Sequence, residues 1–192
     1  MTQGGADLHL GYRRVLYSCG PVLIILSHLG CLILVFTGLG LGAAFWALGL
    51  YAIRMLATTA IYHRLITHAS YKAPKPVAWV GSLVAASAGQ MGPSWWKAHH
   101  QQHHRHVDTA ADPHTPLAPT GGLRGLWRSQ AGWLLSSSFF PETLPADVEA
   151  DPVLRAIDRL HFVPMVALAA LSWQIGGWAW LGAYCLSTTL LY

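Results

Sequence analysis

Histidines are concentrated in one part of this sequence. Eight of the eleven histidines fall between His63 and His114, and two groups have regular spacings. Residues 63–68 read H-R-L-I-T-H, an HxxxxH pair, and residues 100–104 read H-Q-Q-H-H, an HxxHH triplet. Imidazole nitrogens bind Fe, Zn, Cu and Ni, so ligand type alone does not select the metal. The two groups together predict a metal site with five ligands: His63, His68, His100, His103 and His104.

The two spacings place different demands on the backbone. Residues at i, i+3 and i+4 share one face of an α-helix, so His100, His103 and His104 converge if this segment is helical. His63 and His68 are five residues apart, which is about 140° around an ideal helix. They can act at one centre only if the helix end is distorted, or if they bind two different metal ions.

The other histidines and the cysteines are not expected to bind metal. His99, His106 and His114 lie in or near the second group, and no ligand role is assigned to them. The scattered residues His9, His28 and His161 are expected to be ordinary hydrogen-bonded side chains. The three cysteines sit in apolar runs without CxxC spacing, which is typical of small core residues rather than ligands or disulfides.

Composition places these groups in a membrane protein. Of the 192 residues, 53% are hydrophobic and 10% are charged, whereas soluble domains carry about 25% charged residues. The net charge of +4 is spread along the chain without a Lys/Arg block, so no nucleic-acid partner is expected.

An uncharged segment between Arg14 and Arg54 predicts a first helical hairpin. Its 39 residues make ~58 Å of helix, enough for two crossings of a roughly 30 Å hydrocarbon core. The glycine-rich residues 37–42 divide it into spans over residues 15–37 and 41–62. Because positive charges flank the other ends, the N-terminus and the first histidine pair are expected in the cytoplasm. Arg54 either extends to the interface or faces the bundle interior.

Two later apolar segments are not expected to cross the bilayer. Residues 77–92 separate the two histidine groups, and a crossing would put those groups in opposite compartments. This stretch is therefore predicted to be a buried or re-entrant segment. Residues 123–135 alternate arginine and tryptophan with leucine, which favours a helix in the membrane interface or an ordinary amphipathic surface helix.

The end of the sequence predicts a second hairpin. Residues 162–192 have no charged side chain, and Gly176-Gly177 divides them. Only about 15 residues follow, whereas a span needs about 20, so we expect the fourth span to be truncated. The predicted fold is all-α: polytopic membrane helices in two helical hairpins, with a cytoplasmic histidine-rich cap.

The residues around the histidines resemble one family. The sequence reads R-M-L-A-T-T-A-I-Y-H-R into the first pair, G-P-S-W-W-K-A-H-H into the second group, and D-T-A-A-D-P-H downstream. These motifs resemble the first two histidine boxes of the membrane acyl-CoA (Δ9, stearoyl-CoA-type) fatty acid desaturase family. The resemblance runs from about Arg54 to Trp133.

The resemblance implies a fatty acyl desaturase that uses O2 and two iron ions, Fe2+/Fe3+, to insert a cis double bond. His63 and His68 match its first box, and His100, His103 and His104 match its second. No catalytic side chain beyond the metal ligands is implied. A third HxxHH box and a further histidine on the fourth span are also implied, and this sequence contains neither. We therefore expect residues 1–192 to be a single desaturase domain that is C-terminally incomplete and inactive alone.

The resemblance also suggests residues that contact the substrate. Gln90 and Trp96 are candidates to line an acyl tunnel, with core packing and interface anchoring as alternative roles. Lys97 and Arg105 are candidates to meet a phosphate-bearing head group. Asp108 and Asp112 are candidates to accept hydrogen bonds from ligand N–H groups, or are loop and cap residues.

The expected partners are a fatty acyl substrate, either acyl-CoA or lipid-linked, O2, the lipid bilayer, and an electron donor such as cytochrome b5 or ferredoxin with its reductase. The expected location is multi-pass in a bacterial inner membrane or the endoplasmic reticulum. Two alternatives stay open: a related membrane lipid hydroxylase or ketolase, and a non-enzymatic metal-binding membrane protein.

Overall fold

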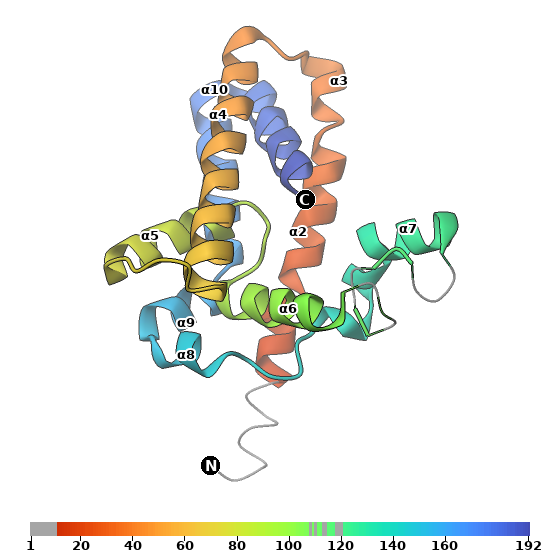
Figure 1. The fold of residues 1–192 in the computed structure, drawn as a ribbon. Helices are drawn as coiled ribbons and strands as arrows, with labels where there is room; N and C mark the ends of the chain where they lie inside the picture. The colour runs from red at the N-terminus through yellow and green to blue at the C-terminus, as the bar shows by residue number, and fades with distance from the viewer. Residues whose placement is uncertain (1–10, 108, 110, 113–114, 118–120) are drawn as a thin grey trace.

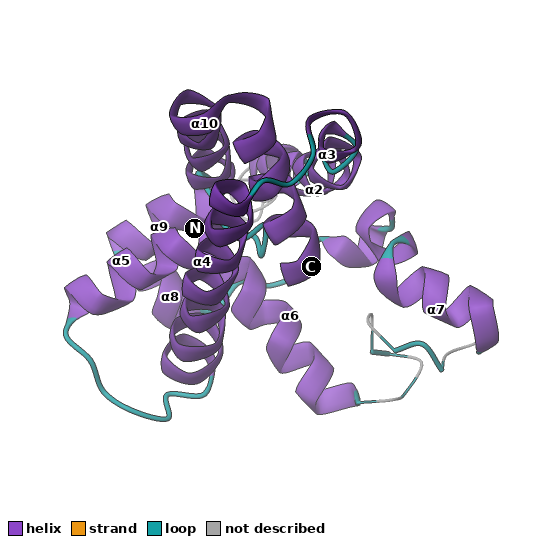
Figure 2. Ribbon diagram, turned by 90° about the horizontal axis from the view of Figure 1, so that it is seen from above, coloured by secondary structure: helices purple, strands orange, loops and turns teal. Residues whose placement is uncertain are grey.

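The computed structural model describes residues 11–107, 109, 111–112, 115–117 and 121–192, and every regular element within them is helical. Figure 1 shows the long helices standing roughly side by side, with α5 to α9 gathered around their lower ends. Seen from above, α6 leads away from this bundle toward α7 (Figure 2). The all-helical fold predicted from the hydropathy pattern is confirmed.

Three helical segments among the described residues are long and apolar enough to cross a membrane. The first two form the predicted hairpin, and Gly38 turns the chain between them at φ 70°, a conformation that favours glycine. The second segment extends beyond its predicted end at Tyr62. The segments are Gly11–Thr37 (α2, Cys19–Gly30, and α3, Ile33–Thr37), Leu41–Thr67 (α4, Leu41–Ala57, and the π-helix η1, Thr58–Thr67) and Phe162–Leu191 (α10).

The chain reverses direction in the middle of α10. Gly176 and Gly177 have non-helical backbone angles, and Gly177 has φ 65°. Figure 1 shows the second half of α10 running back toward the lower end. A Cβ placed on Gly89 would lie 3.4 Å from Met165 and 3.5 Å from Thr188, so both halves pack beside one loop. The second hairpin therefore turns at the predicted glycine pair.

The lower part of the molecule consists of shorter helices. The segment predicted to be re-entrant begins as α5, turns through Gly89 and Met91, both with positive φ, and leads into α6 without crossing the bundle (Figure 1). The predicted interface helix is split into α7 and η2. The bounds are α5, Lys75–Ala86; α6, Pro93–His106; α7, Gly122–Gln130; the 3-10 helices η2, Gly132–Leu135, and η3, Ser137–Phe139; α8, Ala146–Ala150; and α9, Pro152–Arg159.

Arg54 joins the long helices to the loop after α5. Its side chain is buried, and it donates hydrogen bonds to the Leu50 carbonyl (3.1 Å), the Ser87 carbonyl (3.0 Å) and Thr188 Oγ1 (2.9 Å). It also donates to Ser187 Oγ. Of the two predicted roles, the bundle-interior role is therefore correct, because a buried guanidinium needs partners for its donors.

Asp158 of α9 fixes where α6 begins. Its Oδ1 accepts hydrogen bonds from the backbone N–H groups of Ser94 (2.8 Å) and Trp95 (3.0 Å). Its Oδ2 accepts from Tyr17 (2.5 Å) and Arg13 (2.5 Å). A carboxylate at a helix N-terminus satisfies N–H groups that have no partner within the helix. Asp158 thus anchors the histidine-bearing helix to the first span.

Candidate metal centre

The π-helix η1 brings His63 and His68 together. Its backbone hydrogen bonds run from residue i+5 to residue i, and the His68 N–H donates to the His63 carbonyl at 3.0 Å. Residues five apart then lie on nearly the same face, and the two imidazole centroids are 4.7 Å apart. The distorted helix end that the spacing requires is therefore present.

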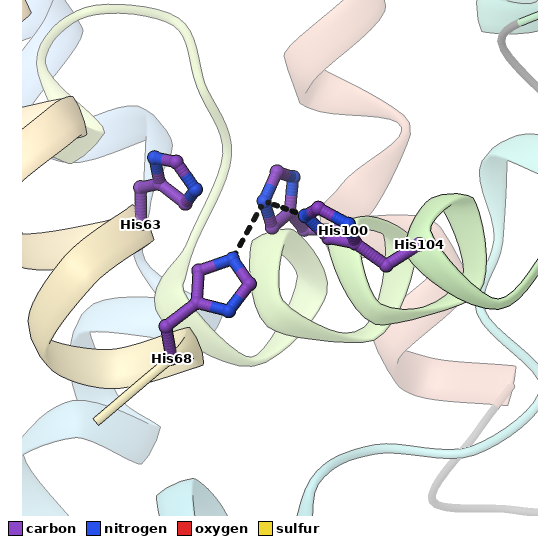
Figure 3. Close-up of side chains that lie close together, drawn as sticks. All are labelled: His63, His68, His100 and His104. Carbon is purple, nitrogen blue, oxygen red and sulfur yellow. Dashed lines mark hydrogen bonds between the residues drawn. The ribbon is translucent and has the colours of Figure 1, made fainter. Parts of the chain in front are cut away.

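Helix α6 supplies a second pair of imidazoles facing the first. His100 and His104 lie one helical turn apart, with ring centroids at 4.5 Å. His100 Nε2 lies 3.3 Å from His68 Nε2 and 3.0 Å from His104 Nε2. Figure 3 shows all four rings converging, two from η1 and the residue that follows it and two from α6, and one nitrogen from each lies within 4.8 Å of the others. Such a group can hold a metal ion.

The surroundings of His100 keep its imidazole neutral. Burial, and to a smaller degree the neighbouring histidines His63, His104, His68 and His103 in that order, together lower the pKa of His100 to about 3. Trp96 stacks on the ring with centroids 4.4 Å apart and an interplanar angle of 25°. A metal binds the neutral imidazole, so this environment favours ligation over protonation.

His103, the fifth predicted ligand, lies outside this group of four. Its Nδ1 is 2.9 Å from Oδ2 of the buried Asp112, and its ring centroid is 6.3 Å from that of His100. Asp112 thus occupies the position expected of a carboxylate that orients a ligating histidine. The structure thus brings His100 and His104 together, as the helical spacing predicted, and leaves His103 outside this group.

A cavity of about 350 Å³ lies beside His100 and His103. Gln90 and Trp96, the two residues predicted to contact substrate, both line it, and the Gln90 amide donates to the Leu191 carbonyl at 3.1 Å. Sequence reasoning missed a second wall, which residues 129–139 contribute. Trp133 and Phe139 in this wall pack against Trp95. The sequence feature that could have indicated this wall is the presence of these large apolar side chains after α7.

The remaining residues singled out in the sequence differ in their burial and hydrogen bonding. Lys97 is buried and donates to the Ile66 carbonyl, whereas Arg105 is exposed; their contact with a head group stays a prediction. His99 is buried against the Phe139 carbonyl at 3.1 Å, and His28 lies 2.8 Å from the Ile24 carbonyl. His9, Asp108 and His114 lie outside the described residues.

The fold and the four imidazoles define a class: a helical membrane protein with a histidine site able to hold a metal. Residues 39–192 match the fatty acid desaturase family, so the chain belongs to that family.

Similar proteins include desaturases of two substrate types. An acyl-CoA 5-desaturase from Anemone leveillei is 34% identical over 70% of this chain and 42% of the relative. An sn-1 stearoyl-lipid 9-desaturase from Anabaena variabilis is 34% identical over 76% of this chain and 58% of the relative. A probable acyl-CoA desaturase from Schizosaccharomyces pombe is 32% identical over 62% of this chain and 24% of the relative. The matched part is therefore less than two thirds of each relative.

Proposed function

We propose that this chain provides the acyl-binding and iron-binding parts of a membrane desaturase that uses O2 to insert a cis double bond into a fatty acyl chain. The observation that carries the proposal is the convergence of His63, His68, His100 and His104 within 4.8 Å. The cavity next to His100 supports it, because an acyl chain needs an apolar channel that leads to the oxidising centre.

The donor set fits iron, because imidazole is an established ligand of that metal. When bound, two iron ions would supply the redox chemistry that O2 activation and C–H oxidation need. The four clustered histidines are proposed as ligands, and His103 as a ligand of the second ion. Asp112 would fix the tautomer and orientation of His103 through the hydrogen bond to its Nδ1.

The remaining residues of the site bind the chain and exclude water. Trp96 stacks on His100 and restricts rotation of that ring, and it also lines the cavity. Gln90 closes the cavity toward the end of α10 by its hydrogen bond to the Leu191 carbonyl. The buried rings of Trp95, Trp133 and Phe139 form an apolar wall that excludes water from the reacting segment.

We further propose an acyl-CoA or lipid-linked substrate, since the relatives carry both kinds of name. An electron donor such as cytochrome b5 or ferredoxin, with its reductase, would bind at the histidine-bearing end, in the cytoplasm. The membrane is a bacterial inner membrane or the endoplasmic reticulum.

Metal binding tests the site directly. Fe2+ bound to the purified chain in nanodiscs is measured by anaerobic competition with a chelator. Changing any one of the four clustered histidines to Ala is expected to weaken binding at least tenfold, because a lost imidazole has no replacement. His28→Ala is the control, since the hydrogen bond described for His28 is to the Ile24 carbonyl in its own helix turn, away from the four clustered histidines. Unchanged affinity in His100→Ala would contradict the assignment.

The reaction is tested by completing the ligand set. A fusion of residues 1–192 to the C-terminal part of the Anabaena variabilis relative is expressed in a desaturase-deficient host, and lipids are analysed by gas chromatography and mass spectrometry. Unsaturated acyl chains are expected from the fusion, and none from its His100→Ala variant. Residues 1–192 alone are expected to give no product, because five histidines supply only part of two coordination spheres. Hydroxylated acyl chains as the main product would contradict desaturation.

A further inference from the structure

Lys97 lies on the same face of α6 as two of the clustered histidines. It precedes His100 by three residues and His104 by seven, which is the spacing of one helix face. Only 7% of Lys97 is exposed. A lysine is rarely buried to this degree unless its ammonium group is paired.

The ammonium group of Lys97 contacts the segment that carries the other two histidines. Its Nζ donates a hydrogen bond to the backbone carbonyl of Ile66 at 2.9 Å and to Asp147 Oδ2 at 2.6 Å. Ile66 lies between His63 and His68 in the last turn of η1. Carbonyls in the last turn of a helix have no partner within it, so the Ile66 carbonyl gains the partner that the helix cannot provide.

The hydrogen bond from Lys97 to the Ile66 carbonyl lies at the level of the clustered histidines, where a change in the separation of η1 and α6 would alter the metal–ligand distances. Tyr62 of η1 also donates a hydrogen bond, to the Met91 carbonyl at 3.0 Å, but Met91 precedes α6. Lys97 lies one turn into α6, next to His100. Metal–ligand distances tolerate errors of only about 0.2 Å, so the separation of η1 and α6 at this level decides whether four imidazoles share an ion.

We propose that Lys97 is a positioning residue of the metal centre: by holding the Ile66 carbonyl, it sets the spacing between the His63–His68 pair and the His100–His104 pair. The inference rests on the proposed metal site. Asp147 has the lesser part, because its side chain is 67% exposed and it lies in α8, which carries no histidine.

The test uses Co2+ as a visible probe for the iron site. The 192-residue chain in nanodiscs is titrated with Co2+ against a competing chelator, and the d–d absorption bands report the coordination geometry. Lys97→Met keeps the length of the side chain but removes its donors, and is expected to weaken Co2+ binding about 10- to 100-fold and to shift the bands. Lys97→Arg keeps a charged donor and is expected to restore most of the affinity.

Two matched variants distinguish the positioning role of Lys97 from the general effect of removing a lysine and from the effect of removing the ion pair with Asp147. Lys75 is the comparison lysine, since its side chain is 75% exposed and 4.0 Å from Asp151. Lys75→Met should bind Co2+ like the unchanged protein. Asp147→Asn removes the ion pair and leaves the Ile66 hydrogen bond, so it should weaken binding less than Lys97→Met.

Each outcome decides the inference. Wild-type affinity and bands in Lys97→Met would overturn it, as would equal losses in Lys97→Met and Asp147→Asn. If Lys97→Met and Lys97→Gln both lose the helical circular dichroism of the metal-free protein, Lys97 serves folding as a whole and the inference is also overturned. If His100→Ala binds Co2+ normally, the proposed metal site itself fails.

Discussion

His161 is a buried histidine whose two ring nitrogens differ in their hydrogen bonding. It is fully buried just before α10, and its Nδ1 lies 3.0 Å from the Asp158 backbone carbonyl, to which it donates. Its Nε2 has no hydrogen-bond partner among the described residues. Burial lowers the pKa of His161 to about 4, although the bond to the carbonyl acts in the opposite direction. Protonation therefore disfavours the folded state.

This environment predicts a pH dependence of stability. The folded pKa of about 4 lies below the unfolded value of about 6.5, so between these values the unfolded state binds the extra proton. The free energy of unfolding should fall as pH drops from about 6.5 to about 4, by about 2 kcal/mol at pH 5 for this residue. Metal-free protein is unfolded by detergent titration at pH 7 and pH 5, and His161→Gln should lose this part of the dependence.

The comparison of His161→Gln with the unchanged chain also controls for the other titratable groups. Asp158, whose backbone carbonyl accepts from His161, and its partner Arg13 are present in both proteins, and so is His100, whose pKa is also lowered. Their contributions cancel in the difference between His161→Gln and the unchanged chain. An identical pH dependence in the two proteins would show that His161 does not titrate in this range.

At the scale of elements, the start of α6 depends on a close approach of two backbones. A Cβ on Gly92 would lie 2.4 Å from Asp158 Cα and 2.5 Å from its Oδ1. Any side chain here would push α9 away from the N–H groups that Asp158 binds. The Gly-Pro pair before the second histidine group is thus a packing requirement that the sequence motif alone does not explain.

Gly92→Ala should destabilise the protein by about 1–3 kcal/mol, because overpacking forces the backbone to shift. It should also weaken metal binding, since α6 carries His100 and His104. Gly49→Ala is the matched control: Gly49 is in the interior of α4, where an added Cβ would meet no other part of the described structure within 4 Å, so alanine should stabilise by roughly 0.5–1 kcal/mol. Detergent unfolding measures both. Equal stability of the two variants would contradict the contact with Asp158.

At the scale of the whole molecule, the meeting of η1 and α6 puts both histidine groups at one end of the bundle (Figure 1). The turn after α3 lies at the other end. This arrangement requires that both groups face the same compartment, whichever side of the membrane that is.

The expected sidedness is tested by cysteine labelling in intact cells. The background lacks Cys19, Cys31 and Cys185. A cysteine at Gly40, an exposed and extended position where an added Cβ would meet no other part of the described structure within 4 Å, should react with an impermeant reagent added outside. A cysteine at the exposed Thr109 should react only after the cells are opened, because positively charged ends stay in the cytoplasm. The reverse pattern would place the histidines outside.

The sequence by itself determined the class of the protein. Hydropathy and glycine pairs are local signals, so the two hairpins and their turns at Gly38 and Gly177 followed from them. Ligand type and spacing are also local, and they gave five candidate ligands, four of which converge in the structure. The role of Arg54 stayed open at that level, because its partners Ser87 and Thr188 come from distant segments.

Only the tertiary structure decided how the ligands are held. The π-helix pairs His63 with His68, yet helical spacing rules assume α geometry and leave that pair apart. Lys97 reaches Ile66 and Asp158 reaches Ser94 across 31 and 64 residues. Such contacts depend on how elements pack in three dimensions. No local pattern encodes them, because the free energy of a buried polar group depends on whichever partner the fold places beside it.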